Sequence, residues 1–538
     1  MSSVVPPGDE KVDGEGGSPS SGLASAALLM IVVTFGSAII GAVRTVLFAW
    51  RFGAEGPASA FFQASRIPDL VYFLIAGGAL RSGFVPVFAQ YWAQGRREEA
   101  WRTFSALFWF LTLLGASVVA VGIGFAPQLS VLIGPGWARE HQQLVPLCAQ
   151  LMRLMFPAQL FFVLGGLLMG TLNARKHFLW PGLGPILYNL VVVIAIAFAT
   201  GPDDLPMVAA VVPVGAFIGN VLVQLPPIRR LGGRLQFIFD LRDEGLRKTL
   251  LLAMPIIFGL AIAEIEFLIM AILATVADPV SGPSTLVYAN LIWRTPTRVF
   301  GGGISIALFP SLAYHFAEGA TEKFRRDFSF AVRTALFMAA PVTVGLIALA
   351  EPIVSLLYQH GEFTEAAVEQ VASTLIIFSL GIVPLTLYYL VARAFYARHD
   401  TATPVTVGLI GLALCASSGW LLMKPLGVPG LALGIALATA LNTGLLWGIL
   451  ERRVGRLGTV QTAHMFLRLM IPLGALTAVC LAATHLTPGL GYGTMITHLL
   501  ALAVGVVGGG SLYLGLASLM RFEELELATS VLRRRSGL

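Results

Sequence analysis

The chain of 538 residues contains 56% hydrophobic and only 12% charged residues, with a mean hydropathy of +0.81. About a quarter of the residues of a soluble globular domain are charged, so this composition excludes an ordinary soluble enzyme. The net charge of +6 would suggest a nucleic-acid partner for a soluble protein. Here the basic residues lie in short breaks between apolar segments, where they act as topology signals, so we expect no nucleic-acid partner.

The first 21 residues combine Pro, Gly, Ser and acidic side chains with almost nothing to bury, which predicts a disordered tail. This tail lacks the basic start and short apolar core of a cleavable signal peptide, so the first apolar segment is expected to remain as an anchor. Residues 521–538 are predicted to form a second, basic tail.

Between the tails, fourteen apolar segments are each long enough for a membrane-crossing helix. The predicted spans are 22–50, 60–92, 103–125, 146–172, 180–200, 206–227, 250–277, 284–315, 328–350, 366–396, 404–423, 428–450, 464–486 and 494–520. We therefore predict an all-α polytopic membrane protein. Two six-helix lobes, residues 22–227 and 250–450, would surround a central cavity, with two further helices within 451–520.

Helix-disturbing residues interrupt the longest predicted spans. They are Pro68, Gly77, Gly78, Pro296 and the triplet 301–303. Kinked or broken helices that line a cavity would explain both the length of these spans and their Pro and Gly content.

Lys and Arg are distributed unevenly among the predicted loops. The loops after the even-numbered spans carry eighteen of them, whereas the opposite loops carry three. Basic loops remain in the cytoplasm, so both termini are predicted to be cytoplasmic. The most basic loop, 228–249, joins the two lobes. Its segment 235–250 is interpreted either as an amphipathic helix on anionic headgroups or as a solvated connector.

Five charged residues inside or at the edges of spans are the candidate site residues: Arg44, Glu264, Glu266, Arg294 and Arg298. A charge at a span centre costs roughly 2.5–3.5 kcal/mol, so it usually marks a functional cavity. The planar guanidinium binds phosphate oxygens bidentately, which makes the three arginines candidates for binding a phosphate-bearing substrate. The alternatives are that Arg44 snorkels to an interface and that the other two arginines pair with acids or headgroups.

The two glutamates pose a separate question. Glu264 and Glu266 differ by about 200° around a helix, so they cannot share one face. Either carboxylate could bind a proton or a coupling cation, or could form an ion pair with Arg294 or Arg298. No metal site is expected.

Six local sequences occur in an order that resembles the MurJ (MviN) family, lipid II flippases of the multidrug/oligosaccharidyl-lipid/polysaccharide exporter superfamily. They are GAVRTVLFAWRFGA (41–54), AFFQASRIPDL (60–70), GFVPVFAQY (83–91), LFPSL (308–312), LYQHGEFT (357–364) and ARAFYARHDTATPV (392–405). The resemblance covers residues 22–520. It implies fourteen helices, two lobes around a cationic cavity, and export of undecaprenyl-pyrophosphate-linked peptidoglycan precursor across the bacterial cytoplasmic membrane.

The resemblance makes Arg44, which matches the family's first-span arginine, the candidate contact for the pyrophosphate. Elsewhere the chain departs from the family. Uncharged residues replace the family's charged ones at Ala38, Ser59, Tyr72, Phe73 and Leu291. Arg294 and Arg298 follow Leu291 on roughly the same helix face and would rebuild the cationic site one or two turns away.

The predicted function is thus alternating-access flipping of lipid II, with the lipid-linked oligosaccharide and membrane lipids as partners. No Walker A loop, HExxH motif or nucleophile elbow is present, which favours a transporter over an enzyme, without a cofactor. Transport is expected to be driven by the membrane potential, a monovalent cation or removal of the product. Two alternatives remain: export of another polyprenyl-linked glycan, and a transport-incompetent paralogue that scaffolds cell-wall synthesis or division proteins.

Overall fold

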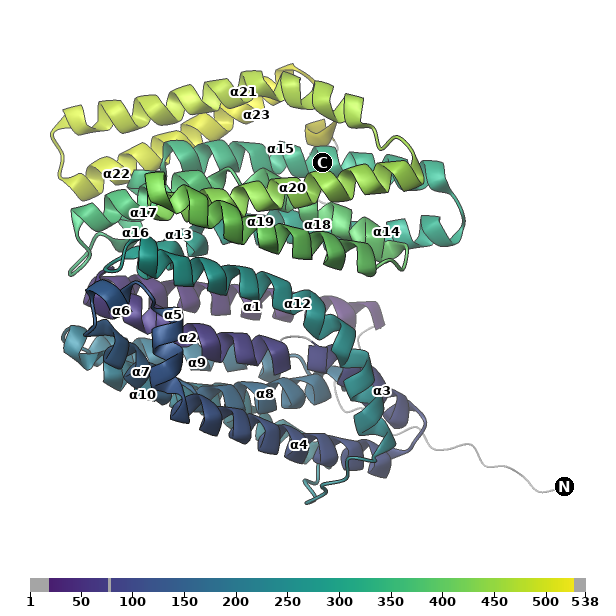
Figure 1. Cartoon of the computed structure of the whole chain (residues 1–538). Helices are drawn as coiled ribbons and strands as arrows, with labels where there is room; N and C mark the ends of the chain where they lie inside the picture. The colour runs from purple at the N-terminus through teal and green to yellow at the C-terminus, as the bar shows by residue number, and fades with distance from the viewer. Residues whose placement is uncertain (1–18, 76–78, 527–538) are drawn as a thin grey trace.

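The computed structural model describes residues 19–75 and 79–526. The predictions for most of the N-terminal tail, for residues 527–538 and for Gly77 and Gly78 lie outside these residues. The described chain is built of helices joined by short turns, which confirms the predicted all-α class (Figure 1).

The first bundle, the N-lobe, contains eleven α-helices among the described residues. They are α1 (Pro19–Phe52), α2 (Gly56–Ile75), α3 (Ala79–Ala93), α4 (Arg97–Gly124), α5 (Ala126–Ile133), α6 (Trp137–Glu140), α7 (Leu144–Met155), α8 (Pro157–Ala174), α9 (Leu179–Phe198), α10 (Leu205–Ala216) and α11 (Leu225–Arg230).

The second bundle, the C-lobe, follows the long helix α12 (Glu244–Ala277). Its helices are α13 (Gly282–Thr297), α14 (Gly303–Ala317), α15 (Thr321–Ala348), α16 (Ala350–Tyr358), α17 (Glu365–Ser379), α18 (Ile382–Ala397), α19 (Ala402–Leu426) and α20 (Val428–Val454). The C-terminal helices are α21 (Thr459–Leu486), α22 (Thr494–Ala503) and α23 (Gly510–Leu519).

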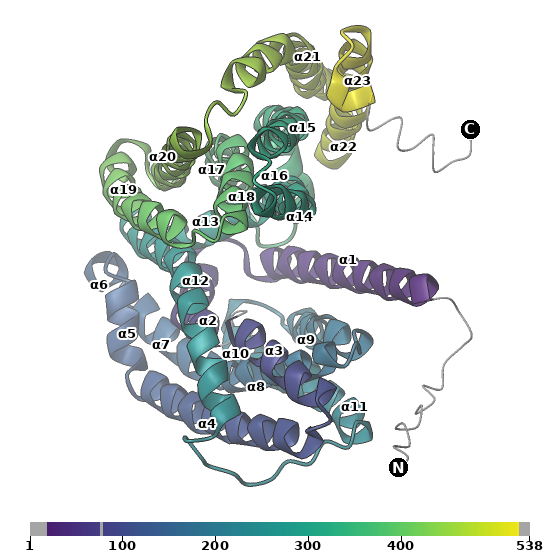
Figure 2. The same cartoon turned by 90° about the vertical axis from the view of Figure 1, so that its right-hand side faces the viewer.

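Figure 2 shows the molecule from one end, with one lobe above the other. Helix α12 crosses between the lobes, and α21 to α23 lie on the outside of the C-lobe. Helix α12 packs against α2 and α3 of the N-lobe and against α19 of the C-lobe. The contact with α3 depends on Gly83, because a Cβ at this position would lie 2.4 Å from the carbonyl oxygen of Thr249 in α12. Helix α12 therefore connects the lobes in the sequence and also packs against both of them.

Eleven helical segments in the described part of the chain are long and apolar enough to cross a membrane. A twelfth is added if α17 and α18, which meet at an angle of 42°, form one broken span. The predicted second and seventh spans are also helical, as α2 with α3 and as α12, but they are not among these twelve. The total of fourteen spans is therefore not confirmed.

The predicted disturbance of the eighth span is confirmed. A π-helical segment, Arg298–Gly302, separates α13 from α14, and Pro296 lies in the last turn of α13. The wider π-helical turn changes which face of the span later residues occupy. Gly301 allows close packing there, since a Cβ would lie 2.7 Å from Tyr389 Cδ2. Pro68 lies inside α2.

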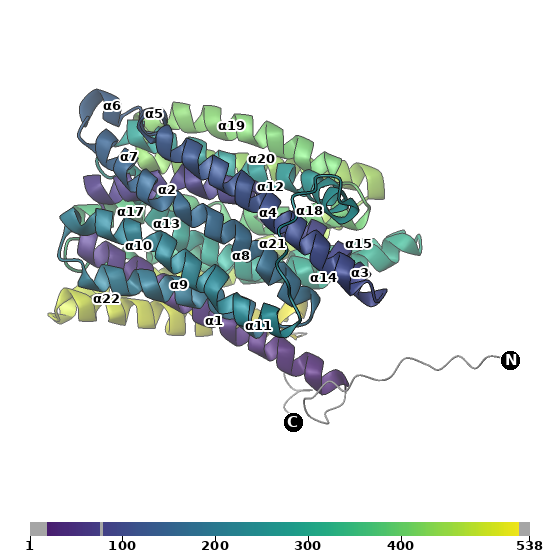
Figure 3. The same cartoon turned by 90° about the horizontal axis from the view of Figure 1, so that it is seen from below.

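Turns that carry the basic residues gather at one end of the bundle. This basic end comprises the turns 94–96, 175–178, 231–243, 398–401 and 455–458, together with the first turns of α15, which carry Lys323, Arg325 and Arg326. Figure 3 shows α3 and α11 near this end and α6 and α22 at the other, which we call the opposite end. The alternation of basic and basic-poor loops in the sequence thus corresponds to two ends of the molecule.

The prediction of an amphipathic helix over 235–250 is wrong for its first nine residues. Residues 233–240 form no helix, and α12 begins only at Glu244. Asp243 caps that helix, because its Oδ1 accepts a hydrogen bond from the backbone of Leu246 at 2.8 Å. The physical reason lies in the apolar residues at 235, 237, 239 and 241, whose period of two places them on one face only when the chain is extended.

Candidate functional site

The first-span arginine lies in a cavity of the N-lobe. This cavity, of about 270 Å³, is lined by residues of α1, α2, α9 and neighbouring helices, among them Arg44, Arg66, Asp69 and Tyr188. The guanidinium of Arg44 lies 5.8 Å from the centre of the Tyr188 ring. Leu291, which replaces the family's cavity arginine, lines the same cavity. The cavity is thus cationic on the α1 side and apolar at the α13 position.

Two charged residues of this cavity were missed in the sequence analysis. Arg66 and Asp69 lie one turn apart on α2, within the predicted span 60–92. Their charge inside a span was the signal that identified the other five candidates, and it applied equally to them. Arg66 Nε is buried and has no hydrogen-bond partner among the described residues. A buried donor without a partner is costly, which makes this nitrogen a candidate contact for an anionic ligand.

Helix α12 brings charges of the two lobes together. The guanidinium of Arg66 lies 4.7 Å from the centre of the Phe267 ring, and that of Arg294 lies 5.5 Å from it. One turn earlier, Glu264 interacts electrostatically with both arginines and with Asp69. Arg66 comes from the N-lobe and Arg294 from the C-lobe, so Phe267 and Glu264 mark the point where the two charged surfaces meet.

A second cavity lies in the C-lobe. It has a volume of about 210 Å³ and is lined by Glu266, Arg294, Tyr388 and Asn442, among others. Glu266 is within hydrogen-bond reach of the Cys415 thiol. Asn442 Oδ1 is buried and accepts no hydrogen bond from the described residues. This cavity therefore offers a carboxylate and an amide oxygen, the donor types that a proton or a hard cation requires.

The five predicted site residues are only partly brought together. Arg44 faces the N-lobe cavity, while Arg294 and Glu266 line the C-lobe cavity. Glu264 and Glu266 face different surroundings, as their helical spacing predicts. Arg298 is exposed at the start of the π-helical segment and lines neither cavity. The roles assigned to these residues stay predictions.

The charges around the two cavities do not cancel. Four arginines, at 44, 66, 294 and 298, stand against the three carboxylates of Asp69, Glu264 and Glu266. None of the seven forms a direct ion pair with another in the part of the chain that the structure describes. The guanidinium groups of Arg44, Arg66 and Arg294 lie over aromatic rings, an arrangement that leaves N–H groups available to an anion.

The lobes meet directly at the opposite end of the bundle. The Tyr288 hydroxyl donates a hydrogen bond to the Gly53 carbonyl at 2.8 Å, and Trp137 Nε1 donates to the Pro279 carbonyl at 2.6 Å. A third contact, between the backbone N–H of Glu362 and the Trp50 carbonyl, measures 2.9 Å. Together with the Oγ atoms of Ser59 and Ser284, which lie 3.0 Å apart, these contacts form what we call the seal.

Glycines allow the backbones to approach each other in the seal. A Cβ on Gly136 would lie 1.6 Å from the carbonyl oxygen of Thr275, and one on Gly361 would lie 2.0 Å from Trp50 Cδ1. Gly361 also has a φ of +58°, which favours glycine. Close backbone contact of this kind excludes water and substrate from the opposite end.

Two helical lobes that enclose charged cavities and close against each other at one end define a membrane transporter of the two-lobed type. The sequence profile of the family described as lipid II flippase MurJ matches residues 48–507. The chain therefore belongs to the lipid II flippase MurJ family.

Individual relatives agree with this assignment. A relative from Vibrio cholerae is 27% identical over 530 residues, covering 95% of this chain and 99% of its own. The lipid II flippase MurJ of Burkholderia cenocepacia is 28% identical over 456 residues, covering 84% and 87%.

Solved structures support the fold. A lipid II flippase MurJ in an inward closed conformation superposes with a TM-score of 0.74 at 23% identity, covering 92% of this chain and 98% of its own. An inward-facing multidrug transporter of the MATE family gives a TM-score of 0.65 at 14% identity, with coverage of 80% and 99%.

Proposed function

We propose that this chain is a lipid II flippase, which moves undecaprenyl-pyrophosphate-linked peptidoglycan precursor from the inner to the outer leaflet of the bacterial cytoplasmic membrane. Membership of the MurJ family supports the substrate class. The observation that carries the mechanism is the convergence of unpaired arginines from both lobes, Arg66 and Arg294, on Phe267 of the shared helix. Such an arrangement suits a pyrophosphate, whose oxygens accept bidentate hydrogen bonds from guanidinium groups.

The basic end faces the cytoplasm in this proposal, because basic loops are retained there, and both termini are cytoplasmic. The seal closes the outer side, so the headgroup reaches the arginines from the cytoplasmic side. Its polyprenyl tail remains in the lipid. Separation of the lobes at the seal then exposes the headgroup to the outer side.

The proposed binding set differs from the family pattern. Arg44 contacts the pyrophosphate, as the resemblance implies, and Arg66 and Arg294 supply the charge that Leu291 lacks. The exposed Arg298 attracts the headgroup at the edge of the site. The exported precursor is then available to cell-wall synthesis proteins, which are the proposed protein partners at the outer face.

Coupling is proposed to involve Glu266 in the C-lobe cavity. Its carboxylate and the unpartnered Asn442 Oδ1 support uptake of a proton or a monovalent cation there. Such uptake would make the transport rate respond to the membrane potential. A Glu266→Gln variant is expected to transport lipid II at a rate independent of an imposed proton or sodium gradient. A retained gradient dependence would contradict the role of Glu266.

The function is tested by measuring lipid II translocation in a strain whose only flippase is this chain. Replacing Arg44 or Arg66 by Ala removes charge-assisted hydrogen bonds, and each is expected to lower translocation about 10- to 100-fold. Arg139→Ala is the matched control, because Arg139 is exposed on α6 outside both cavities. Normal translocation by both cavity variants, or none by well-expressed wild-type protein, would contradict the proposal.

A further inference from the structure

The irregular segment 233–241, which we call the strap, lies along α4. Ser105 Oγ donates a hydrogen bond to the Arg234 carbonyl at 3.3 Å and accepts one from the Gln236 N–H at 3.2 Å. Trp109 Nε1 donates to the Gln236 carbonyl at 2.9 Å. The strap is thus attached to α4 through its backbone, although it forms no regular secondary structure.

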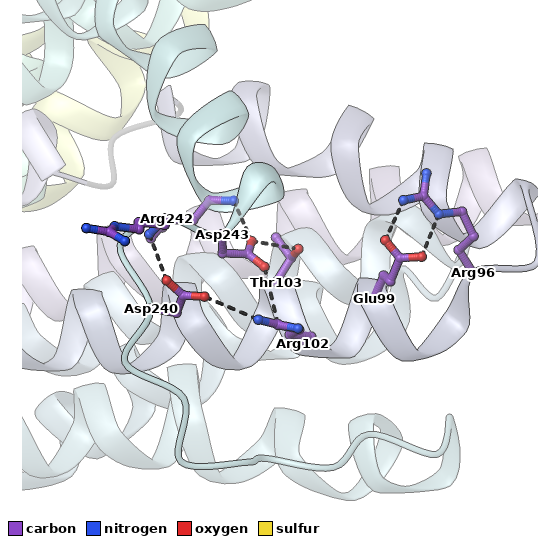
Figure 4. Close-up of polar contacts among 8 residues, drawn as sticks. Arg96, Glu99, Arg102, Thr103, Asp240, Arg242 and Asp243 are labelled. Atoms are coloured by element: carbon purple, nitrogen blue, oxygen red, sulfur yellow. Dashed lines mark hydrogen bonds and ion pairs between the residues drawn. The ribbon is translucent and has the colours of Figure 1, made fainter.

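Ion pairs fasten the C-terminal end of the strap. Arg102 of α4 lies between Asp240 and Asp243, with N–O distances of 3.2 and 3.7 Å (Figure 4). Asp243 also accepts a hydrogen bond from Thr103 Oγ1 at 3.1 Å. The strap is therefore fastened on both sides of its apolar residues.

One face of the strap is apolar and uncovered. Its alternate residues Leu235, Phe237, Phe239 and Leu241 are 51%, 81%, 50% and 55% exposed. The centre of the Phe237 ring lies 4.9 Å from that of Trp109, and most of the side chain remains exposed. Four large apolar side chains on one face of a fastened segment require an apolar environment to cover them.

The position of the strap on α4 indicates that this environment is lipid. Helix α4 is among the segments apolar enough to cross a membrane. Trp109 follows Arg102 by seven residues, so the strap reaches about 10 Å further along the span than its ion pairs. Backbone N–H and C=O groups without a hydrogen-bond partner are costly at that depth. Ser105 and Trp109 supply partners for the backbone groups of Arg234 and Gln236. Tryptophan itself is typical of the membrane interface.

Basic residues surround the strap. Arg229, Arg230, Arg234, Arg242 and Arg247 are all exposed beside it. A surface that combines exposed aromatic side chains with arginines is complementary to anionic phospholipid, which carries acyl chains next to its phosphate.

We propose that the strap inserts Leu235, Phe237, Phe239 and Leu241 into the cytoplasmic leaflet and binds anionic phospholipid through its flanking arginines. It thereby anchors the N-lobe at the point where the chain passes to the shared helix α12. The anchor is a lipid-binding surface outside the transport cavities, and it does not depend on the identity of the transported substrate.

The depth of the strap can be measured by spin labelling of the full chain in vesicles. The native cysteines at 148, 415 and 480 are buried and free, so they can be replaced by Ala before Phe237→Cys is introduced. The label at 237 is expected to collide more often with oxygen than with a water-soluble nickel complex. Gln236→Cys is the matched control, because its side chain lies on the other face. A label at 237 that collides more often with the nickel complex than with oxygen would overturn insertion and favour a protein partner for this face.

Lipid selectivity is measured separately, by native mass spectrometry of the protein titrated with phosphatidylglycerol or phosphatidylcholine. Arg234→Gln and Arg242→Gln are each expected to lower phosphatidylglycerol retention about fivefold, without changing phosphatidylcholine retention. Arg139→Gln, at the opposite end, should have no effect. Equal retention of the two lipids by the wild-type chain would overturn the proposed selectivity. Neither measurement involves lipid II, so failure here leaves the flippase proposal untouched.

Discussion

The two ends of the bundle hold the lobes together in different ways. At the opposite end, helices of the N-lobe touch helices of the C-lobe directly, through backbone carbonyls accepting bonds from Tyr288 and Trp137. At the basic end, the connection runs through α12 and the strap, both of which are attached to the N-lobe. The first set of contacts can break without unfolding either lobe, whereas the second belongs to the packing of one lobe.

The contrast between the two ends indicates where movement is possible. The seal consists of a few hydrogen bonds and close glycine contacts between two separate bodies, and each bond contributes only about 0.5–1.5 kcal/mol. A ligand that binds the open state better than the closed state can therefore shift the equilibrium. Variants at the two ends should separate effects on the closed state from effects on folding.

The largest effect is expected for Gly136→Ala. The added Cβ would lie 1.6 Å from the Thr275 carbonyl oxygen, so the two backbones must move apart at this contact. We expect Ser284→Cys, which is buried when the seal is closed, to react with a membrane-impermeant thiol reagent in this variant. Gly201→Ala is the control, because no atom lies within 4 Å of its Cβ position. Protection of the cysteine in the Gly136 variant would contradict the assignment of the seal.

At the basic end the corresponding change, Gly83→Ala, should act on stability. Its Cβ would meet the Thr249 carbonyl at 2.4 Å, and overpacking of this kind costs about 1–3 kcal/mol. Thermal unfolding should begin at a lower temperature, while the reactivity of the Ser284→Cys reporter stays at its wild-type rate. A faster reaction would show that the two ends are coupled.

A smaller effect is expected for Tyr288→Phe, which leaves the Gly53 carbonyl without its donor. A loss of about 1 kcal/mol should raise the reaction rate of the Ser284→Cys reporter about fivefold. Tyr358→Phe serves as the comparison, since the two rings lie 4.9 Å apart and the Tyr358 hydroxyl forms no hydrogen bond with the described residues. Equal rates in the two variants would mean that the hydroxyl contributes nothing to closure.

The smallest effect concerns pH. Burial raises the pKa of Asp278, but hydrogen bonds from Ser281, Gln370 and Val280 outweigh it and hold the pKa below the usual value for aspartate. A carboxylate with a lowered pKa stabilises the folded state above its unfolded pKa, and this contribution is lost as the pH falls through the folded pKa. The rate of the Ser284→Cys reporter is divided, at each pH, by that of a Gly201→Cys variant in order to remove the ionisation of the thiol itself. This ratio should stay constant between about pH 8 and about pH 5. A rise within that range would contradict this account of the loop.

The sequence predicted the helical class, the spans with strong apolar runs and the disturbed eighth span, because these depend on local composition. It also contained the signal for Arg66 and Asp69, which are charges within a predicted span. Of the two interpretations of residues 235–250, the amphipathic helix was wrong for the strap, because the apolar residues there alternate with a period of two.

No local feature of the sequence predicted the contacts of the seal. Tyr288 and the Gly53 carbonyl are 235 residues apart, and a backbone carbonyl has no side chain to identify it. The convergence of Arg66 and Arg294 on Phe267 likewise depends on how α12 crosses between the lobes, which no local pattern determines.

The central claim is that lipid II crosses only when the seal opens. The Oγ atoms of Ser59 and Ser284 lie 3.0 Å apart, so cysteines at both positions should form a disulfide on oxidation. The account predicts that oxidised S59C/S284C protein does not translocate lipid II, that reduction restores translocation, and that each single cysteine variant is insensitive to oxidant. Translocation by the fully cross-linked protein would contradict the claim.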